Sequence, residues 1–203
     1  MISHEFKTIF VHVPKTAGTS IEGMFGLVKT WPGKRKFQEI QGAGKHWGIS
    51  EMSKEYKDYL NDYFKWTVVR NPWEREFSLF KMMRGQLRYR HLSFKDFLIK
   101  VTKHHLQYTG SKFKNMVFRN QVEYLIHNGS LGVDKVIRYE DLHEGWKEVC
   151  DIIKKPYEPL MSLRRIRSRL PITAHYDQES IDLVAEMRKE DIEYFNYDYS
   201  ELK

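Results

Sequence analysis

Runs rich in β-branched and aromatic residues predict three strands in this chain. The first run is short and made largely of such residues, which is typical of a buried strand. The three predicted strands span residues 6–13, 64–70 and 133–139. After each run, apolar residues at intervals of three and four predict a helix. These helices are expected to begin near Thr19, Asn71 and Leu142.

Weaker patterns complete the predicted order of elements. Helical spacing is present in residues 52–63, 94–101, 121–127 and 178–194, and a short strand is expected near residues 37–40. Strands that alternate with helices predict an α/β fold, a P-loop-like parallel β-sheet flanked by helices, in a single domain over residues 1–203. In such sheets ligands bind beyond the carboxyl ends of the strands. The loops after the first two strands are therefore the candidate sites.

The composition excludes several classes of protein. Of 203 residues, 41% are hydrophobic and 14% aromatic, which excludes a disordered chain. One cysteine, Cys150, excludes a disulfide framework and a cysteine-rich zinc site. Neither a membrane-spanning run nor a basic-then-apolar leader is present in the sequence, so we expect a cytoplasmic protein with no membrane partner. The net charge of +7 fits an anionic ligand without deciding the partner.

The first loop, residues 14–20, has the composition of an anion site. A strand, a loop of small residues and a helix start direct main-chain N–H groups at one point, where the helix adds partial positive charge. Lys15 adds a full charge, and Thr16, Thr19 and Ser20 add hydroxyl groups. These groups would hold a phosphate or a sulfate. The alternative is an ordinary strand-to-helix turn in which Thr19 is the N-cap.

This loop differs from the Walker A motif of kinases and ATPases. That motif has its lysine directly after the second glycine, followed by a hydroxyl that binds Mg²⁺. Here Lys15 precedes Gly18 by three residues, and Asp141 is expected to cap a helix instead of assisting a metal. A metal-dependent nucleotide kinase is disfavoured, and no metal is expected.

The second loop follows the strand that ends at Arg70. Asn71 is expected to cap the next helix, with Pro72 at its first position and Glu74 closing a capping box. Ser78 follows Arg70 by eight residues, about two turns into the helix. Taken alone, the two residues are an arginine at a strand end and a serine on a helix surface.

Taken together, the two loops resemble the sulfotransferases that use 3′-phosphoadenosine 5′-phosphosulfate, and more closely the carbohydrate-type, family-2 branch. The family's first motif, Pro-Lys-Thr-Ala/Gly-Gly/Ser-Thr-Ser, is similar to residues 14–20. Its second motif is similar to Arg70, Asn71-Pro72, Arg75 and Ser78. Residues 136–142 and 191–197 resemble its late strand and closing helix. Residues 29–63 and 85–118 match weakly, and acceptor specificity would lie there.

The resemblance implies a sulfotransferase fold and a site for the donor nucleotide. The first motif would grip the 5′-phosphosulfate through Lys15, Thr16, Ala17, Gly18, Thr19 and Ser20. Arg70 and Ser78 would hold the 3′-phosphate. The implied reaction moves a sulfuryl group to a hydroxyl of a carbohydrate or other small acceptor by in-line displacement, and leaves adenosine 3′,5′-bisphosphate.

The chemistry needs one cation and one base. Sulfuryl transfer is similar in form to phosphoryl transfer, in which positioning and fixed positive charge supply most of the catalysis. Lys15 would neutralise the leaving phosphate oxygen. His46 is the candidate general base, since the family carries a histidine in a similar position. The alternative for His46 is a structural role, and His12 is expected to be a satisfied structural histidine.

The densest cationic run is residues 164–169. Arg167 in this run is a candidate donor-binding residue, while nucleic-acid contact or a solvated loop are alternatives. His175 could also reach the nucleotide, and the adjacent His104 and His105 are expected to be solvated. Two functions from other classes stay open here, a P-loop-like kinase and a non-catalytic polyanion- or nucleic-acid-binding module. The sulfotransferase hypothesis expects no nucleic acid as partner.

Overall fold

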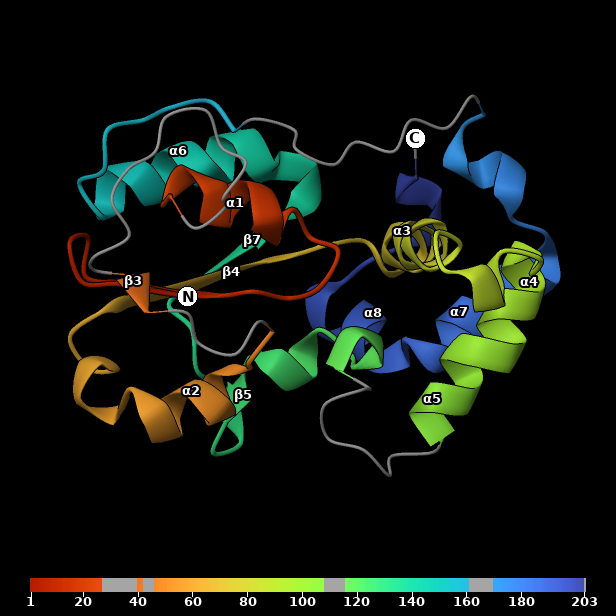
Figure 1. Cartoon of the computed structure of the whole chain (residues 1–203), viewed down its shortest axis with the longest axis horizontal. Helices are drawn as coiled ribbons and strands as arrows, with labels where there is room; N and C mark the ends of the chain where they lie inside the picture. The colour runs from red at the N-terminus through yellow and green to blue at the C-terminus, as the bar shows by residue number, and fades with distance from the viewer. Residues whose placement is uncertain (27–39, 42–45, 108–115, 161–169, 203) are drawn as a thin grey trace. The chain divides into compact units, whose positions relative to one another are not determined.

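The chain divides into two compact units (Figure 1). The computed structural model describes residues 1–26, 40–41, 46–107, 116–160 and 170–202. Unit 1 consists of Met1–Val69 and Glu123–Arg165, and unit 2 of Arg70–Val122 and Ile166–Lys203. Unit 1 contains the main sheet, and the described part of unit 2 is helical.

Unit 1 is built on a five-stranded sheet with the order β3-β1-β2-β4-β7. The strands are β1 Ile2–Ser3, β2 Thr8–Val11, β3 Ile40–Gln41, β4 Phe64–Val69 and β7 Lys135–Arg138. β4 runs parallel to both β2 and β7, whereas β1 is antiparallel to β2 and β3. The three predicted strands and the α/β class are confirmed. β2 starts late because Lys7, with φ of 43°, still belongs to a turn.

In the described part of unit 1, three helices cover the sheet. α1 (Gly18–Met24) and α6 (Leu142–Ile152) lie on one face, and α2 (Ile49–Glu55) on the other (Figure 1). Single 3₁₀ turns, Lys57–Tyr59 and Tyr139–Asp141, follow α2 and precede α6. The helical spacing of residues 52–63 was thus partly misleading, since α2 ends at Glu55.

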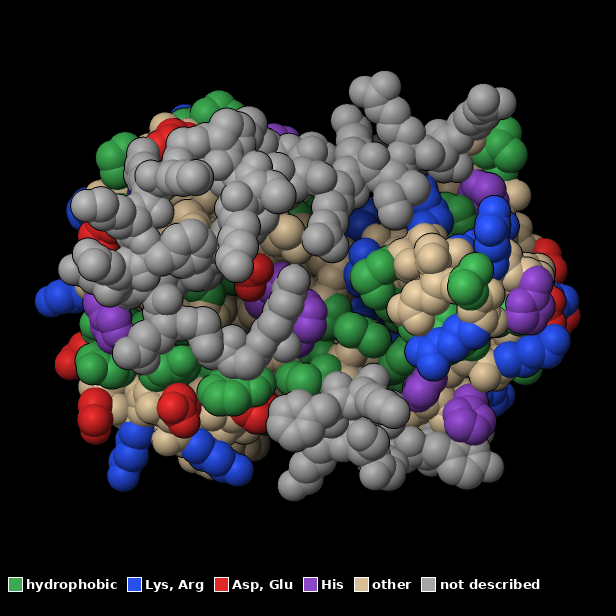
Figure 2. All heavy atoms as spheres, viewed as in Figure 1, with side chains coloured by type: hydrophobic (Ala, Val, Ile, Leu, Met, Phe, Trp, Pro, Cys, Tyr) green, Lys and Arg blue, Asp and Glu red, His purple; other side chains and the backbone are tan. Residues whose placement is uncertain are grey.

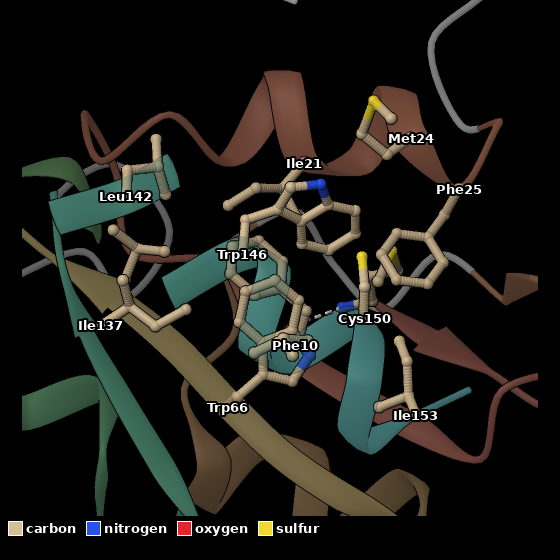
Figure 3. Close-up of a cluster of buried hydrophobic side chains, with 13 residues drawn as sticks. Phe10, Ile21, Met24, Phe25, Trp66, Ile137, Leu142, Trp146, Cys150 and Ile153 are labelled. Atoms are coloured by element: carbon tan, nitrogen blue, oxygen red, sulfur yellow. Dashed lines mark hydrogen bonds between the residues drawn. The ribbon is translucent and has the colours of Figure 1, made fainter. Parts of the chain in front are cut away.

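The core of unit 1 is aromatic. Trp66 on β4 lies with its ring 4.7 Å from that of Phe10 and 5.8 Å from that of Trp146 on α6 (Figure 3). All three side chains are fully buried, which stabilises the fold by about 1.5–3 kcal/mol for each. α6 approaches the sheet closely because Gly145 has no side chain, and a Cβ there would overlap Ile137.

The prediction of a helix over residues 121–127 is wrong. One 3₁₀ turn, Val122–Tyr124, is followed by a hairpin of β5 Ile126–His127 and β6 Ser130–Leu131. The two loop residues are Asn128 and Gly129, with φ of 51° and 79°. Positive φ at both positions is the signature of a type I′ turn, for which Asn-Gly is the preferred pair. The pair turns a hairpin here and does not stop a helix.

Unit 2 is formed around α3, Pro72–Met83. A continuous helical stretch then runs through α4 Phe94–Phe97, a π-helix Leu98–Lys103 and α5 His104–Gln107. Towards the C-terminus follow α7 Gln178–Met187 and α8 Lys189–Phe195. Single 3₁₀ turns span Leu87–Tyr89, Met116–Phe118, Ile172–His175 and Tyr199–Glu201. Aromatic and aliphatic residues of α3, α4 and the π-helix form the core.

A buried ion pair interrupts the predicted helix 178–194. Arg188, at φ of −117°, separates α7 from α8, so the single helix expected there is wrong. Its guanidinium lies 2.7 Å from the carboxylate of Glu76 on α3, and both side chains are fully buried. It also donates to the main-chain oxygen of Phe118 and to Asn120, and Thr102 donates to Glu76. The tertiary partners thus override local helix propensity.

Candidate functional site

The loop after β2 has an unusual backbone. Lys15 and Ala17 have φ of 73° and 67°, in the left-handed region that residues with a side chain rarely adopt. Left-handed residues next to right-handed ones turn successive N–H groups towards one point and form a concave anion site. Such strain persists where surrounding structure holds it, and it concentrates at functional sites. The backbone therefore fits a phosphate or sulfate group.

Thr16 holds this loop in shape. Its fully buried hydroxyl donates to the main-chain oxygen of Val13 at 2.8 Å, so its proton is committed to the protein. The expected role of this hydroxyl as a ligand donor does not agree with that bond. Thr19 is not the N-cap of α1, so the alternative of an ordinary strand-to-helix turn capped by Thr19 is wrong. Ala17 occupies that position, and its main-chain oxygen accepts from Ser20 and Ile21.

His12 packs directly against the start of α1. Its ring covers Gly18, where a Cβ would overlap the imidazole carbons and Nε2. Its Nδ1 lies 2.6 Å from Oε1 of Glu22, one turn further along α1. The side chains of His12 and Glu22 are 5% and 14% exposed. His12 is thus a satisfied, buried histidine, as expected, and it ties the end of β2 to α1.

His46 lies against His12 in the same unit. The two rings meet edge to face with centroids 4.4 Å apart. Nδ1 of His46 lies 3.2 Å from the main-chain oxygen of His12, and His46 has φ of 76°. His12 therefore contacts both the candidate base, His46, and Gly18 in the loop that contains Lys15. Trp47, which follows His46, is half-buried.

Arg70 is held by two side chains of unit 2. The buried amide of Gln121 accepts from the Arg70 main-chain N and donates to its main-chain O, both at 2.8 Å. Nε of Arg70 donates to Oε2 of Glu74 at 3.0 Å. Glu74 was expected to close a capping box, and it pairs with Arg70 instead. Asn71 caps α3 as predicted, because its Oδ1 accepts from the main-chain N of Trp73.

Ser78 lies half-buried on α3, two turns after Arg70. Near it on the same helix, the ammonium of Lys81 lies 5.2 Å from the centroid of the Phe77 ring. Burial, together with the charge of Arg70, lowers the pKa of Lys81. The ring of His175 stacks on the same Phe77 ring, with centroids 4.5 Å apart. Lys81 and Arg70 thus place positive charge at this part of α3.

Arg75, the second arginine of the second motif, has a structural role. It is 1% exposed, and its guanidinium donates to the main-chain oxygens of Val117 and Arg119. It therefore ties α3 to the turn around Met116–Phe118.

Some predicted residues lie outside the described residues. These are Arg167 and the cationic run around it, residues 164–169. His105 stacks on the ring of Phe118 at 4.3 Å, so it is packed, not solvated. In the part of the chain that the structure describes, no helix has the length and apolar character needed to cross a membrane. No cluster of three potential metal ligands is found among these residues either.

Comparison with known proteins decides the family. A family model described as "Sulfotransferase family" matches residues 1–198, nearly the whole chain. The chain belongs to the sulfotransferase family. It is an enzyme that depends on 3′-phosphoadenosine 5′-phosphosulfate, within the family-2 branch. No curated protein and no solved structure matched it significantly. Membership decides against the two other classes, a kinase and a non-catalytic binding module.

The contacts around the sulfotransferase motifs were not all visible in the sequence. Glu22 and Gln121 belong to neither motif. Glu22 binds His12, and Gln121 holds the backbone of Arg70. The only available signal for Glu22 was its position four residues after Gly18, on the same face of α1. Gln121 is 51 residues from Arg70, and no local pattern indicates such a contact.

Proposed function

We propose that this sulfotransferase transfers a sulfuryl group from 3′-phosphoadenosine 5′-phosphosulfate to a hydroxyl group of a carbohydrate acceptor. The observation that carries the proposal is the left-handed backbone at Lys15 and Ala17, within the family's first motif. Lys15, Thr16, Ala17, Gly18, Thr19 and Ser20 would bind the 5′-phosphosulfate, Thr16 through its main-chain N–H because its hydroxyl donates to Val13. The family match includes segments of both units, which supports one sulfotransferase domain.

Arg70 and Ser78 would bind the 3′-phosphate. A guanidinium suits a phosphate because it donates two parallel hydrogen bonds. Glu74 and Gln121 support this role, since they hold the side chain and the backbone of Arg70. We assign Arg167 to the same nucleotide as a proposal from the sequence alone.

In the proposed reaction the acceptor oxygen attacks sulfur in line with the leaving phosphate. The new S–O bond forms as the S–O bond to the 5′-phosphate breaks, and the electron pair of that bond goes to the phosphate oxygen. Lys15 would stabilise the charge that develops there. His46 would accept the proton of the acceptor hydroxyl. Adenosine 3′,5′-bisphosphate is the second product.

The distribution of charge supports an anionic acceptor. Residues 77–122 contain ten Lys and Arg residues and one acidic residue, Asp96, a net charge of +9, whereas the rest of the chain has 24 against 26. Lys95, Lys100 and Lys103 form ion pairs with nearby carboxylates. The exposed Arg84 and Arg88 lie instead over the rings of Phe80 and Tyr89, at 5.4 Å and 4.5 Å.

Figure 2 shows Lys and Arg side chains on the visible surface around α3 and α4. A guanidinium that stacks on an aromatic ring still has its edge N–H groups directed outward, and these suit carboxylate or sulfate groups. We therefore propose an acceptor sugar that already bears negative charges.

The experiment uses radiolabelled donor and two oligosaccharides that differ only in carboxylate groups. We expect transfer to both, a lower KM for the anionic one, and a rise of that KM with salt. Arg84→Gln with Arg88→Gln should raise only the KM for the anionic acceptor, whereas Lys189→Gln on α8 serves as a control. Equal KM values at all salt concentrations would contradict an anionic acceptor. Absence of transfer to any hydroxyl compound would contradict the function itself.

A further inference from the structure

We propose that Glu22 and His12 are positioning residues that orient His46 with its proton on Nδ1. Nε2 of His46 then becomes the atom that accepts the proton of the acceptor hydroxyl. This inference rests on the proposed role of His46 as general base, and it adds two residues that act through His46 without touching the reacting atoms.

The first step concerns the tautomer of His46. A main-chain oxygen only accepts hydrogen bonds, so the 3.2 Å contact between Nδ1 of His46 and the oxygen of His12 requires the proton on Nδ1. In a neutral imidazole the other nitrogen, Nε2, then has an unshared electron pair. A general base needs this state. The partner of one ring nitrogen thus determines which nitrogen reacts, as in metal sites.

The second step concerns what holds His12. An ionised Glu22 only accepts, so its 2.6 Å contact places a proton on Nδ1 of His12. The ring is also confined by Gly18 beneath it and by the ring of His46 at its edge. His12 therefore has fixed positions for both its side chain and its main-chain oxygen. Loss of the Glu22 contact would release the ring and loosen the support of His46.

The third step concerns the backbone of His46. A histidine in the left-handed region, at φ of 76°, needs neighbours that hold it there. Two of these contacts come from His12, one from its ring and one from its main-chain oxygen. Gly18 and Glu22, which contact His12, belong to α1, the helix that begins at the donor loop. The base and the donor loop thus share one support within unit 1.

The test compares Glu22→Gln and Glu22→Ala with Asp134→Asn. Asp134 is a matched control because its carboxylate also accepts one short hydrogen bond, at 2.7 Å. The donor is the main-chain N of Lys65, near the start of β4. Replacing a residue that orients a functional histidine typically costs about 10–100-fold, and we expect a loss of kcat in that range for Glu22→Ala. Glu22→Gln keeps an accepting oxygen and should lose less. The affinity for adenosine 3′,5′-bisphosphate and the KM of the acceptor should change little.

A second measurement needs no activity. Two-bond ¹H–¹⁵N spectra of the histidine rings, assigned with His46→Gln, report which nitrogen of His46 carries the proton. We expect protonated Nδ1 in the wild-type protein and a mixture of tautomers in Glu22→Ala. A proton on Nε2 in the wild-type protein, or wild-type kcat in Glu22→Ala, overturns the inference. Full activity of His46→Gln refutes instead the proposed base, and the spectra still decide the tautomer.

Discussion

Nε of Arg70 donates to Oε2 of Glu74 at 3.0 Å, across one turn at the start of α3. The two side chains are 17% and 21% exposed. The carboxylate restricts the guanidinium before a ligand arrives, and Gln121 fixes the backbone beneath it. Holding an arginine in place in this way reduces the entropy lost when it binds an anion.

We predict that Arg70→Ala weakens binding of adenosine 3′,5′-bisphosphate much more than binding of AMP. A hydrogen-bonded charge pair contributes about 1.5–3 kcal/mol, so the affinity for the bisphosphate should fall about 10–100-fold. Isothermal titration calorimetry with both nucleotides measures the difference. Lys189→Ala, which removes a cation from α8, should leave both affinities unchanged. Equal losses of affinity for both ligands in Arg70→Ala would contradict the assignment of Arg70 to the 3′-phosphate.

Lys15→Ala should abolish transfer and preserve the fold. Removing one group that stabilises developing charge costs about 10²–10³-fold in kcat. Because Lys15 has a full charge, we expect a loss at the upper end of that range. The matched control is Lys7→Ala, since Lys7 is also a lysine with positive φ, in the turn before β2. Initial rates and circular dichroism of both variants are measured. Wild-type rates in Lys15→Ala would reject its role at the leaving oxygen.

The strands and the first motif could be predicted because their signals are local. β2 and β4 are rich in β-branched and aromatic residues, and the cap at Asn71 depends on the next two residues alone. The hairpin at Asn128 was missed because Asn-Gly both ends helices and turns hairpins, and only the pairing of Ile126 with Leu131 distinguishes them.

The supports of the site could not be predicted because they depend on tertiary contacts. Gly18 was expected to help to hold the 5′-phosphosulfate, and the structure shows that the ring of His12 covers it. Arg75 was part of a binding motif, yet its guanidinium is turned inward to main-chain oxygens. Sequence spacing shows which residues share a helix, but not which of them meets another segment.

Gly18→Ala should destabilise the protein and impair transfer. A Cβ at Gly18 overlaps the His12 ring, and such overpacking costs about 1–3 kcal/mol in the free energy of unfolding. Urea denaturation measures it. The control, Gly85→Ala, places a Cβ 3.3 Å from one atom, the main-chain oxygen of Met82, and should cost less. Removing the ring in a Gly18→Ala/His12→Ala double variant should cost less than the sum of the single changes, and strict additivity would contradict the overlap.

Arg188→Met should be among the most destabilising changes in unit 2. It leaves Glu76 as an uncompensated charge in a fully buried position, which typically costs about 3–5 kcal/mol. Adding Glu76→Leu removes that charge and should restore part of the lost stability. The exposed pair of Lys189 and Glu193 is the control, and its removal should cost about 0.5 kcal/mol or less. A similar loss for both pairs in urea denaturation would contradict this difference.

The thiol of Cys150 should be unreactive in the folded protein. Burial raises its pKa from 9.0 to about 11, so the thiolate that reacts with iodoacetamide is scarce at pH 8. Below pH 9 the folded and unfolded states both hold the proton, so stability does not vary with pH through this thiol. As the pH rises from 9 towards 11 the unfolded state loses the proton first, so the contribution to stability is lost across that window. The difference in melting temperature between wild type and Cys150→Ala isolates this effect from lysine and tyrosine titration. Rapid labelling at pH 8 without denaturant, or a difference that stays constant from pH 8 to 11, would show that the thiol is accessible to water.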